Sequence, residues 1–325
     1  MCIALLLVCG GLHAGAQSPT RIRAVLDTDA NNELDDQHAI AYLLFNDDAF
    51  DAEGITVNAT RNGGDVDEQA AEADRVVRLS GAESRVPVVK GAQGSFDAIA
   101  PHASEPRFDG SPAVEFIIRR ARQPDARRLV LIAIGKLTNV ALARKRDPSI
   151  APRLRVVWLG SNYPEPGEYN QDNDPAAVNY LLDASVDFEI VLVRYGKPSG
   201  TDAVRVTLEE IRQHMKGAGP RTAAPVTGRN GGQFTTFGDY SVNLFEHSHM
   251  YGTPPSRALF DLAAVAIVKQ PRWASRRFVP APRLEGEAWV ERPGNPRRIA
   301  LWENFDRAHI IEDLFDSTAR PALVR

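Results

Sequence analysis

The chain has 325 residues, of which 43% are hydrophobic and 25% are charged, a composition typical of a globular protein with a sizeable core. Its net charge is -4 at pH 7, and its lysine and arginine residues are scattered, so we exclude a nucleic acid polymer as a partner. No repeat, low-complexity stretch or Gly/Ser linker marks a boundary, and residues 17–325 are predicted to form a single domain.

The first residues, 1–16, form the apolar segment MCIALLLVCGGLHAGA, which is too short to span a bilayer and ends in a small-x-small pattern. Such a segment is typical of a secretory signal peptide, which predicts a periplasmic or secreted protein. Both cysteines, Cys2 and Cys9, lie inside it, so the mature chain would contain no disulfide and no thiolate metal ligand. No later segment is long and apolar enough for a membrane span.

Apolar runs that resemble strands alternate with helical patterns along the rest of the chain. The strand-like runs are RAVLD, EGITVNAT, VPVVKGA, RLVLIAIG, RVVWLG and DFEIVLVR, and segments such as ELDDQHAIAYLLF and SPAVEFIIRRAR between them have helical periodicity. This alternation predicts a doubly wound α/β fold, with a mostly parallel, open, Rossmann-like sheet and helices on both faces. Helices are expected to continue over about 207–270, and EAWVERPGNPRRIALWE predicts a C-terminal β-hairpin that turns at Gly294-Asn295.

An acidic cluster lies where the first strand leads into the first helix, in VLDTDANNELDDQHAIAYLL at residues 25–44. Asp27 and Asp29 end the strand, and Asp35 and Asp36 fall in the first turn of the helix. Ligands of open α/β sheets bind outside the carboxyl ends of the strands, so this position favours a divalent cation site. The alternative is a solvated acidic loop in which an asparagine caps the helix.

Polar side chains also follow the other predicted strands. Because the carboxyl ends of parallel strands share one edge of the sheet, an acidic and amide-rich pocket is expected there. The polar residues at these strand ends are Asn58, Thr60, Thr138, Asn139, Asn162, Glu168, Asn170 and Asp174.

Four motifs, in order, make the sequence similar to the inosine-uridine preferring nucleoside hydrolase family. The acidic cluster resembles the family's D-x-D-P-G-x-D-D-A, with two residues inserted and Pro-Gly lost, and IAIGKLTNVALA resembles ALGPLTNLALA. GSNYPEPGEYNQDNDPAA is similar to GNVTPVAEFNIYVDPEAA, and ALFDLAAVAIV is similar to PMHDPLAVA. The resemblance implies hydrolysis of the N-glycosidic bond of ribonucleosides, with a small-molecule nucleoside as partner.

The resemblance further implies a calcium site. Asp29, Asp36 and Asp261 would donate carboxylates, and Thr138 would donate its backbone carbonyl. Hard oxygen ligands of this kind favour Ca²⁺ over Zn²⁺ or Cu²⁺. Asp29 is also the expected catalytic base, taking a proton from the attacking water.

The resemblance implies a ribose site beside the calcium. Asp35, Asn162, Glu168 and Asn170 would bind the hydroxyls of the sugar, and Asn58 is included as a further substrate-binding residue at a strand end. Asp174 precedes a proline at the start of a helix, which indicates a helix cap rather than a ligand.

The leaving base is expected to meet Phe260, where relatives that cleave both purines and pyrimidines often have a histidine. Phe260 cannot donate a proton but can stack on a base, so we expect purine nucleosides to be favoured. His247 or His249, in FEHSHMYG, is the candidate catalytic acid, delivered by a mobile lid.

Two other functions remain open at this stage. A secreted ribose- or nucleoside-binding protein could keep the metal without turnover. A haloacid-dehalogenase-like phosphatase also begins with a strand ending in D-x-D, and Asp27 would then attack phosphorus with the help of Mg²⁺. A homo-oligomer is possible in either case.

Overall fold

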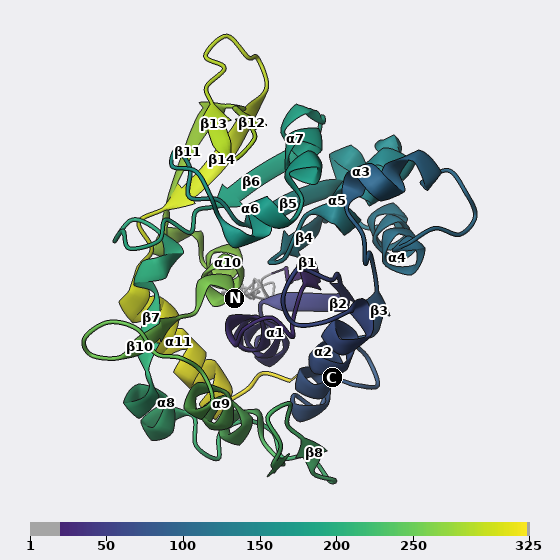
Figure 1. The fold of residues 1–325 in the computed structure, drawn as a ribbon. Helices are drawn as coiled ribbons and strands as arrows, with labels where there is room; N and C mark the ends of the chain where they lie inside the picture. The colour runs from purple at the N-terminus through teal and green to yellow at the C-terminus, as the bar shows by residue number, and fades with distance from the viewer. Residues whose placement is uncertain (1–19, 324–325) are drawn as a thin grey trace, which may run out of the picture.

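A computed structural model describes residues 20–323 and is built around one sheet of eight strands (Figure 1). Seven strands are parallel, and the edge strand β11 pairs antiparallel with β14. The expected signal peptide lies outside the described residues. In spatial order the strands are β11 (Ser275–Pro280), β14 (Arg298–Glu303), β6 (Asp187–Val191), β5 (Leu154–Leu159), β4 (Leu129–Ala133), β1 (Ile22–Thr28), β2 (Phe50–Val57) and β3 (Val88–Lys90).

Helices cover both faces of this sheet and enclose two apolar cores, which confirms the doubly wound α/β fold. Helices α1, α2, α9, α10 and α11 pack on one core, and α4, α5 and α7 pack on the other. Within residues 20–323, no helix is long and apolar enough to cross a membrane. The α-helices are α1 (Asp35–Phe45), α2 (Val66–Leu79), α3 (Phe96–Ile99), α4 (Ser111–Arg122), α5 (Thr138–Arg146), α6 (Tyr169–Asn173), α7 (Pro175–Asp183), α8 (Leu208–His214), α9 (Phe237–Glu246), α10 (Phe260–Lys269) and α11 (Arg307–Ala319).

The central strands are buried on both faces because helices cover each side. Every residue of β4 is buried, and its sequence, LVLIA, is continuously apolar, as expected of a strand inside a parallel sheet. Short 3₁₀ helices lie at Ala100–His102, Pro148–Arg153, Thr201–Ala203 and Pro271–Trp273.

The order of the strands reverses beside β1. From β1 the chain builds outward through β2 and β3, and it then crosses to β4 and builds in the other direction through β5 and β6. The carboxyl ends of β1 and β4 therefore flank a topological switch point, where open α/β sheets bind their ligands.

The C-terminal hairpin is present, but its strands and turn differ from the expectation. The segment AWV forms β13 (Ala288–Val290), which pairs with β12 (Arg283–Glu285) on the other side of Gly286 and Glu287. The segment RIALWE forms β14, which joins the central sheet between β6 and β11. A turn does lie at residues 292–295, but the hairpin predicted around Gly294-Asn295 was wrong, because this turn connects β13 to β14, which belong to different sheets.

The region 207–270 is less helical than expected. Helices α8, α9 and α10 are separated by loops and by two pairs of short strands, which form small sheets of their own. These strands are β7 (Arg205–Thr207) with β10 (Ser256–Ala258), and β8 (Val226–Thr227) with β9 (Gln233–Phe234).

Candidate functional site

The acidic cluster lies at the switch point and is buried. Asp29 follows β1, and Asp35 and Asp36 form the first turn of α1, whose N-terminus favours negative charge. No side chain of the described residues caps α1, so the asparagine-capped, solvated loop considered from the sequence is not what the chain forms. These carboxylates instead line a cavity of about 420 Å³.

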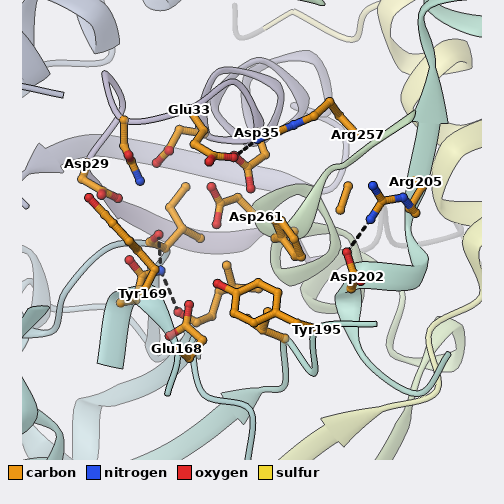
Figure 2. A pocket seen from close by; sticks show the side chains of 18 of the residues that line it. Asp29, Glu33, Asp35, Glu168, Tyr169, Tyr195, Asp202, Arg205, Arg257 and Asp261 are labelled. Carbon is orange, nitrogen blue, oxygen red and sulfur yellow. Dashed lines mark hydrogen bonds and ion pairs between the residues drawn. The ribbon is translucent and has the colours of Figure 1, made fainter. Parts of the chain in front are cut away.

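Three carboxylates of this cavity could hold a metal ion. Oxygens of Asp35, Asp36 and Asp261 lie within 4.8 Å of one another, with Asp261 contributed by the first turn of α10 (Figure 2). Burial raises the pKa of Asp35 to about 6 and raises the pKa values of Asp36 and Asp261 well above their usual range. Gathering carboxylates away from water is costly unless a cation neutralises them, so this oxygen-only set fits a hard divalent ion.

Asp29 lies beside the three carboxylates and has its own partner. The Thr60 hydroxyl donates to Asp29 Oδ2 at 2.6 Å, and the Tyr169 hydroxyl donates to Thr60 Oγ1 at 3.1 Å. Burial raises the pKa of Asp29 to about 6, and the Thr60 hydrogen bond opposes that rise. This chain of hydrogen bonds links the loop after β2 and α6 to Asp29.

Asp27 is not among the residues that line the cavity. It is fully buried and accepts hydrogen bonds from Thr56 at 2.6 Å, Asn58 at 3.0 Å and Asn139 at 2.8 Å. Burial raises its pKa to about 6. With both oxygens engaged, Asp27 ties β1 to β2 and α5 and has no free oxygen for attack on a substrate.

Gly135 allows the chain after β4 to approach this layer closely. A Cβ atom at position 135 would lie 2.8 Å from Asp29 Oδ1 and 3.2 Å from the amide of Asn58. The glycine of the IAIGKLTN motif therefore has a steric role beneath the acidic cluster.

The loop after β5 supplies the other polar wall of the cavity. Glu168 caps α6, and its Oε2 accepts from the backbone N–H groups of Ser161 and Gln171, each at 2.9 Å. Burial raises the pKa of Glu168 to about 7. Asn170 donates to the carbonyls of Ile134 at 2.9 Å and Leu159 at 3.2 Å.

Asn170 Oδ1 is buried and has no partner in the described part of the chain, although the residue lines the cavity. Because a buried acceptor without a partner is costly, this oxygen is suited to a ligand hydroxyl.

The remaining wall of the cavity combines aromatic rings and guanidinium groups. The rings of Phe260 and Tyr195 meet edge to face with centroids 5.8 Å apart, and Arg257 lies 5.2 Å from the centre of the Tyr251 ring. Arg205 lines the same side of the cavity. In Figure 2, Arg205 lies on the far side of Asp261 from Asp29, the Arg257 guanidinium reaches Glu33 beside Asp35, and the Tyr195 ring lies between Asp261 and Glu168.

The structure brings together seven of the residues selected from the sequence. The cavity is lined by Asp29, Asp35, Asp36, Glu168, Asn170, Phe260 and Asp261.

Asn58, Asn162 and Thr138 are not among the residues that line the cavity. Asn58 donates to Asp27, and Asn162 accepts from the Tyr195 backbone at 3.1 Å. Thr138 is the first residue of α5, and its hydroxyl donates to Asp174, which caps α7.

The two candidate acids also lie outside the cavity lining. His247 and His249 are exposed at the end of α9, and His247 Nδ1 contacts the Asn243 carbonyl at 2.8 Å. The ring of His249 packs against Tyr251, with centroids 4.6 Å apart. Neither histidine reaches the cavity in this arrangement, although Tyr251 does.

Sequence reasoning missed several residues of the cavity wall. Ile134 is the strand-end residue that lines the cavity, four positions before the Thr138 that was selected. Tyr169 directly follows Glu168, and Arg257 precedes Asp261 by four residues, so proximity to a recognised motif was the available signal. Glu33 belongs to the acidic cluster itself and pairs with Arg257 at the cavity edge.

Comparisons with known proteins identify the family of this chain. The sequence profile of the family described as inosine-uridine preferring nucleoside hydrolase matches residues 24–314. A protein of Oryza sativa subsp. japonica, named probable uridine nucleosidase 1, is 30% identical over 193 residues, covering 53% of this chain and 58% of that protein. The chain thus spans just over half the length of the curated relatives it matches first.

Solved structures share the fold over most of the chain. A plant nucleoside hydrolase aligns with a TM-score of 0.71 at 18% identity, covering 93% of this chain and 100% of the other. A purine-preferring ribonucleoside hydrolase from Gardnerella vaginalis aligns with a TM-score of 0.65 at 19% identity, covering 91% and 98%. With a profile match over most of its length, the chain belongs to the inosine-uridine preferring nucleoside hydrolase family.

Proposed function

We propose that this protein hydrolyses the N-glycosidic bond of ribonucleosides and releases free base and ribose. The observation that carries the proposal is the unpartnered Asn170 Oδ1 in the same cavity as three carboxylates at metal-binding distance. A sugar with adjacent hydroxyls suits both features, because it can donate to the amide oxygen while its oxygens approach a cation. The cavity volume of about 420 Å³ lies in the usual range for small-molecule sites.

We propose Ca²⁺ as the resident cation, held by Asp35, Asp36 and Asp261 with Asp29 beside them. If the strand end supplies a carbonyl ligand, Ile134 is better placed than Thr138, because Ile134 lines the cavity. When bound, the ion would neutralise the carboxylates and lower the pKa of a nearby water.

The chain's own residues then divide the chemistry. Asp29 takes the proton of the attacking water, while Thr60 fixes the orientation of its carboxylate. Glu168 and Asn170 bind and orient the sugar. Cleavage passes through a cationic, oxocarbenium-like state, so negative charge in excess of the metal's stabilises the transition state.

We propose that purine nucleosides are preferred. Phe260 and Tyr195 offer an aromatic wall for a large planar base, and Phe260 provides no proton for a pyrimidine. The names of the relatives point both ways, since one is a probable uridine nucleosidase and another a purine-preferring hydrolase. Support for the purine preference therefore comes from the cavity wall.

The phosphatase alternative loses its nucleophile in this structure. Asp27 would have to attack phosphorus, but its oxygens accept hydrogen bonds from Thr56, Asn58 and Asn139, and it does not line the cavity. A nucleoside-binding protein without turnover uses the same cavity and is separated from a hydrolase by assay.

The test is a screen of the mature chain with Ca²⁺ against inosine, guanosine, adenosine, uridine and cytidine, in which free base and ribose are quantified. We expect release of both products, and we expect Asp29→Asn to abolish it while the exposed Asp316→Asn, a matched control, has no effect. Binding of nucleosides without product would reject the hydrolase.

A further inference from the structure

The cavity has two ends with different chemistry. One end carries the carboxylates and the Asn170 amide, and the proposed function assigns the sugar to it. The other end carries two guanidinium–carboxylate pairs, Arg205 with Asp202 and Arg257 with Glu33 (Figure 2). The rings of Tyr195, Tyr251 and Phe260 also line the cavity. With its sugar at the acidic end, a nucleoside extends its base toward these pairs and rings.

Arg257 is the less satisfied of the two guanidinium groups. The residue is 7% exposed; its Nη2 pairs with Glu33, and its Nη1 donates to the His249 carbonyl at 3.3 Å. Its buried Nε–H has no partner among residues 20–323. A guanidinium has five N–H donors, so a charged group with unused donors forms part of this wall.

Arg205 differs in this respect. Its three nitrogens donate to Asp202 Oδ1 at 2.5 Å, Ser256 Oγ at 3.0 Å and the Ser256 carbonyl at 3.1 Å. Arg205 therefore has a partner for every nitrogen and holds the β7–β10 pair in place.

Phe260 and Glu33 line the same cavity as Arg257. The Phe260 side chain has no proton to donate to a leaving base. The acidic cluster is two residues longer than the family's motif, and Glu33 lies in the lengthened stretch. Glu33 pairs with Arg257, which lies 224 positions later in the sequence. The lengthened stretch therefore positions the Arg257 guanidinium as a hydrogen-bond donor in the cavity wall.

We propose that Arg257 is a catalytic residue that stabilises the departing base by hydrogen bonding, in a chain whose Phe260 cannot protonate it. This role rests on the proposed hydrolase function. As the bond between C1′ and the base nitrogen breaks, its electron pair stays on the base, and Arg257 donates to an acceptor atom over which the charge spreads.

Arg257 itself keeps its protons, because a guanidinium is a donor and not an acid near neutral pH. The departing base takes a proton from solvent. The attacking water gives its oxygen to C1′ and its proton to Asp29, which returns that proton to solvent, so one water is consumed.

The test compares two leaving groups in one set of variants. The 4-nitrophenolate of 4-nitrophenyl β-D-riboside departs without assistance, whereas the base of inosine needs it. We expect Arg257→Met to lower kcat/KM for inosine about 100-fold, which is the usual cost of removing a donor to a developing anion. We expect kcat/KM for the nitrophenyl riboside to change less than about threefold. Activity on the nitrophenyl riboside also reports that the variant folds.

Two further variants sharpen the result. Arg257→Lys keeps the charge, and we expect it to recover part of the inosine activity. Arg205→Met, the matched control, is expected to keep the wild-type ratio of the two kcat/KM values. If Arg257→Met and Arg257→Lys lower kcat/KM equally for both substrates, or for neither, Arg257 has no role at the leaving group. A wild-type chain that cleaves neither substrate instead overturns the proposed function itself.

Discussion

Replacing Thr60 with valine removes one hydroxyl from beneath the candidate base while keeping the shape of the side chain. In the structure this hydroxyl donates to Asp29 Oδ2 at 2.6 Å and accepts from Tyr169 at 3.1 Å. A hydroxyl has one proton to donate, so the Tyr169 contact leaves the Thr60 proton directed at Asp29.

The size of the effect follows from the kind of bond that is lost. A buried hydrogen bond to a charged group contributes about 1.5–3 kcal/mol, and each 1.36 kcal/mol corresponds to a factor of ten in rate. If the whole contribution serves to orient Asp29 for proton transfer, we expect kcat of Thr60→Val to fall about 10- to 150-fold. KM is expected to change little, because Thr60 is not among the residues that line the cavity.

Steady-state kinetics with inosine at saturating Ca²⁺ measures both constants. Thr60→Ser keeps the hydroxyl and serves as the matched control, with kcat expected near that of the wild type. If Thr60→Val keeps the wild-type kcat, or if KM rises while kcat does not fall, Thr60 does not position the catalytic base.

Four other outcomes are expected. Burial raises the Glu168 pKa from 4.5 to about 7, so this group stabilises the folded chain at low pH and loses that contribution as the pH rises through 7. The free energy of unfolding, measured in urea with EDTA present, is therefore expected to rise by about 2–3 kcal/mol for Glu168→Gln relative to wild type between pH 5 and pH 8. A difference between the two free energies that does not change with pH would refute this. Calcium is expected to raise the wild-type Tm in thermal melts, because it neutralises buried carboxylates, and to raise that of Asp261→Ala much less; an equal rise places the ion elsewhere. Phe260→His is expected to increase the ratio of uridine to inosine turnover while calcium affinity, measured by calorimetry, stays constant; an unchanged ratio shows that position 260 does not set base preference. His247→Gln and His249→Gln are each expected to keep kcat within about threefold, as for most surface substitutions, and a large loss in either would identify the leaving-group acid.

The local parts of the fold were predictable from the sequence. Continuous apolar runs such as residues 129–133 identify the parallel strands, because a strand buried on both faces needs no polar alternation. The acidic cluster was equally informative, since its five carboxylates lie within ten residues of sequence and the strand-to-helix change places them near the sheet's carboxyl edge. That reasoning required no knowledge of distant contacts.

The parts that depend on distant contacts were not predictable. A strand-like pattern does not specify its partner, which is why the strands of the C-terminal hairpin were paired wrongly and the turn was placed at Gly294-Asn295. Thr138 was selected as a carbonyl ligand by resemblance to the family's motif, yet the residue that lines the cavity at the end of that strand is the apolar Ile134. The pairing of Arg257 with Glu33 was not predictable, because the two residues lie 224 positions apart in the sequence.

The central claim is hydrolysis, and product analysis tests it most directly. The purified chain is incubated with inosine and Ca²⁺, with and without added phosphate, and hypoxanthine, ribose and ribose 1-phosphate are quantified by chromatography. The account predicts hypoxanthine and free ribose in equal amounts, with no dependence on phosphate, and loss of both in Asp29→Asn. Inosine that is bound but recovered intact, or ribose 1-phosphate formed only when phosphate is present, would contradict it.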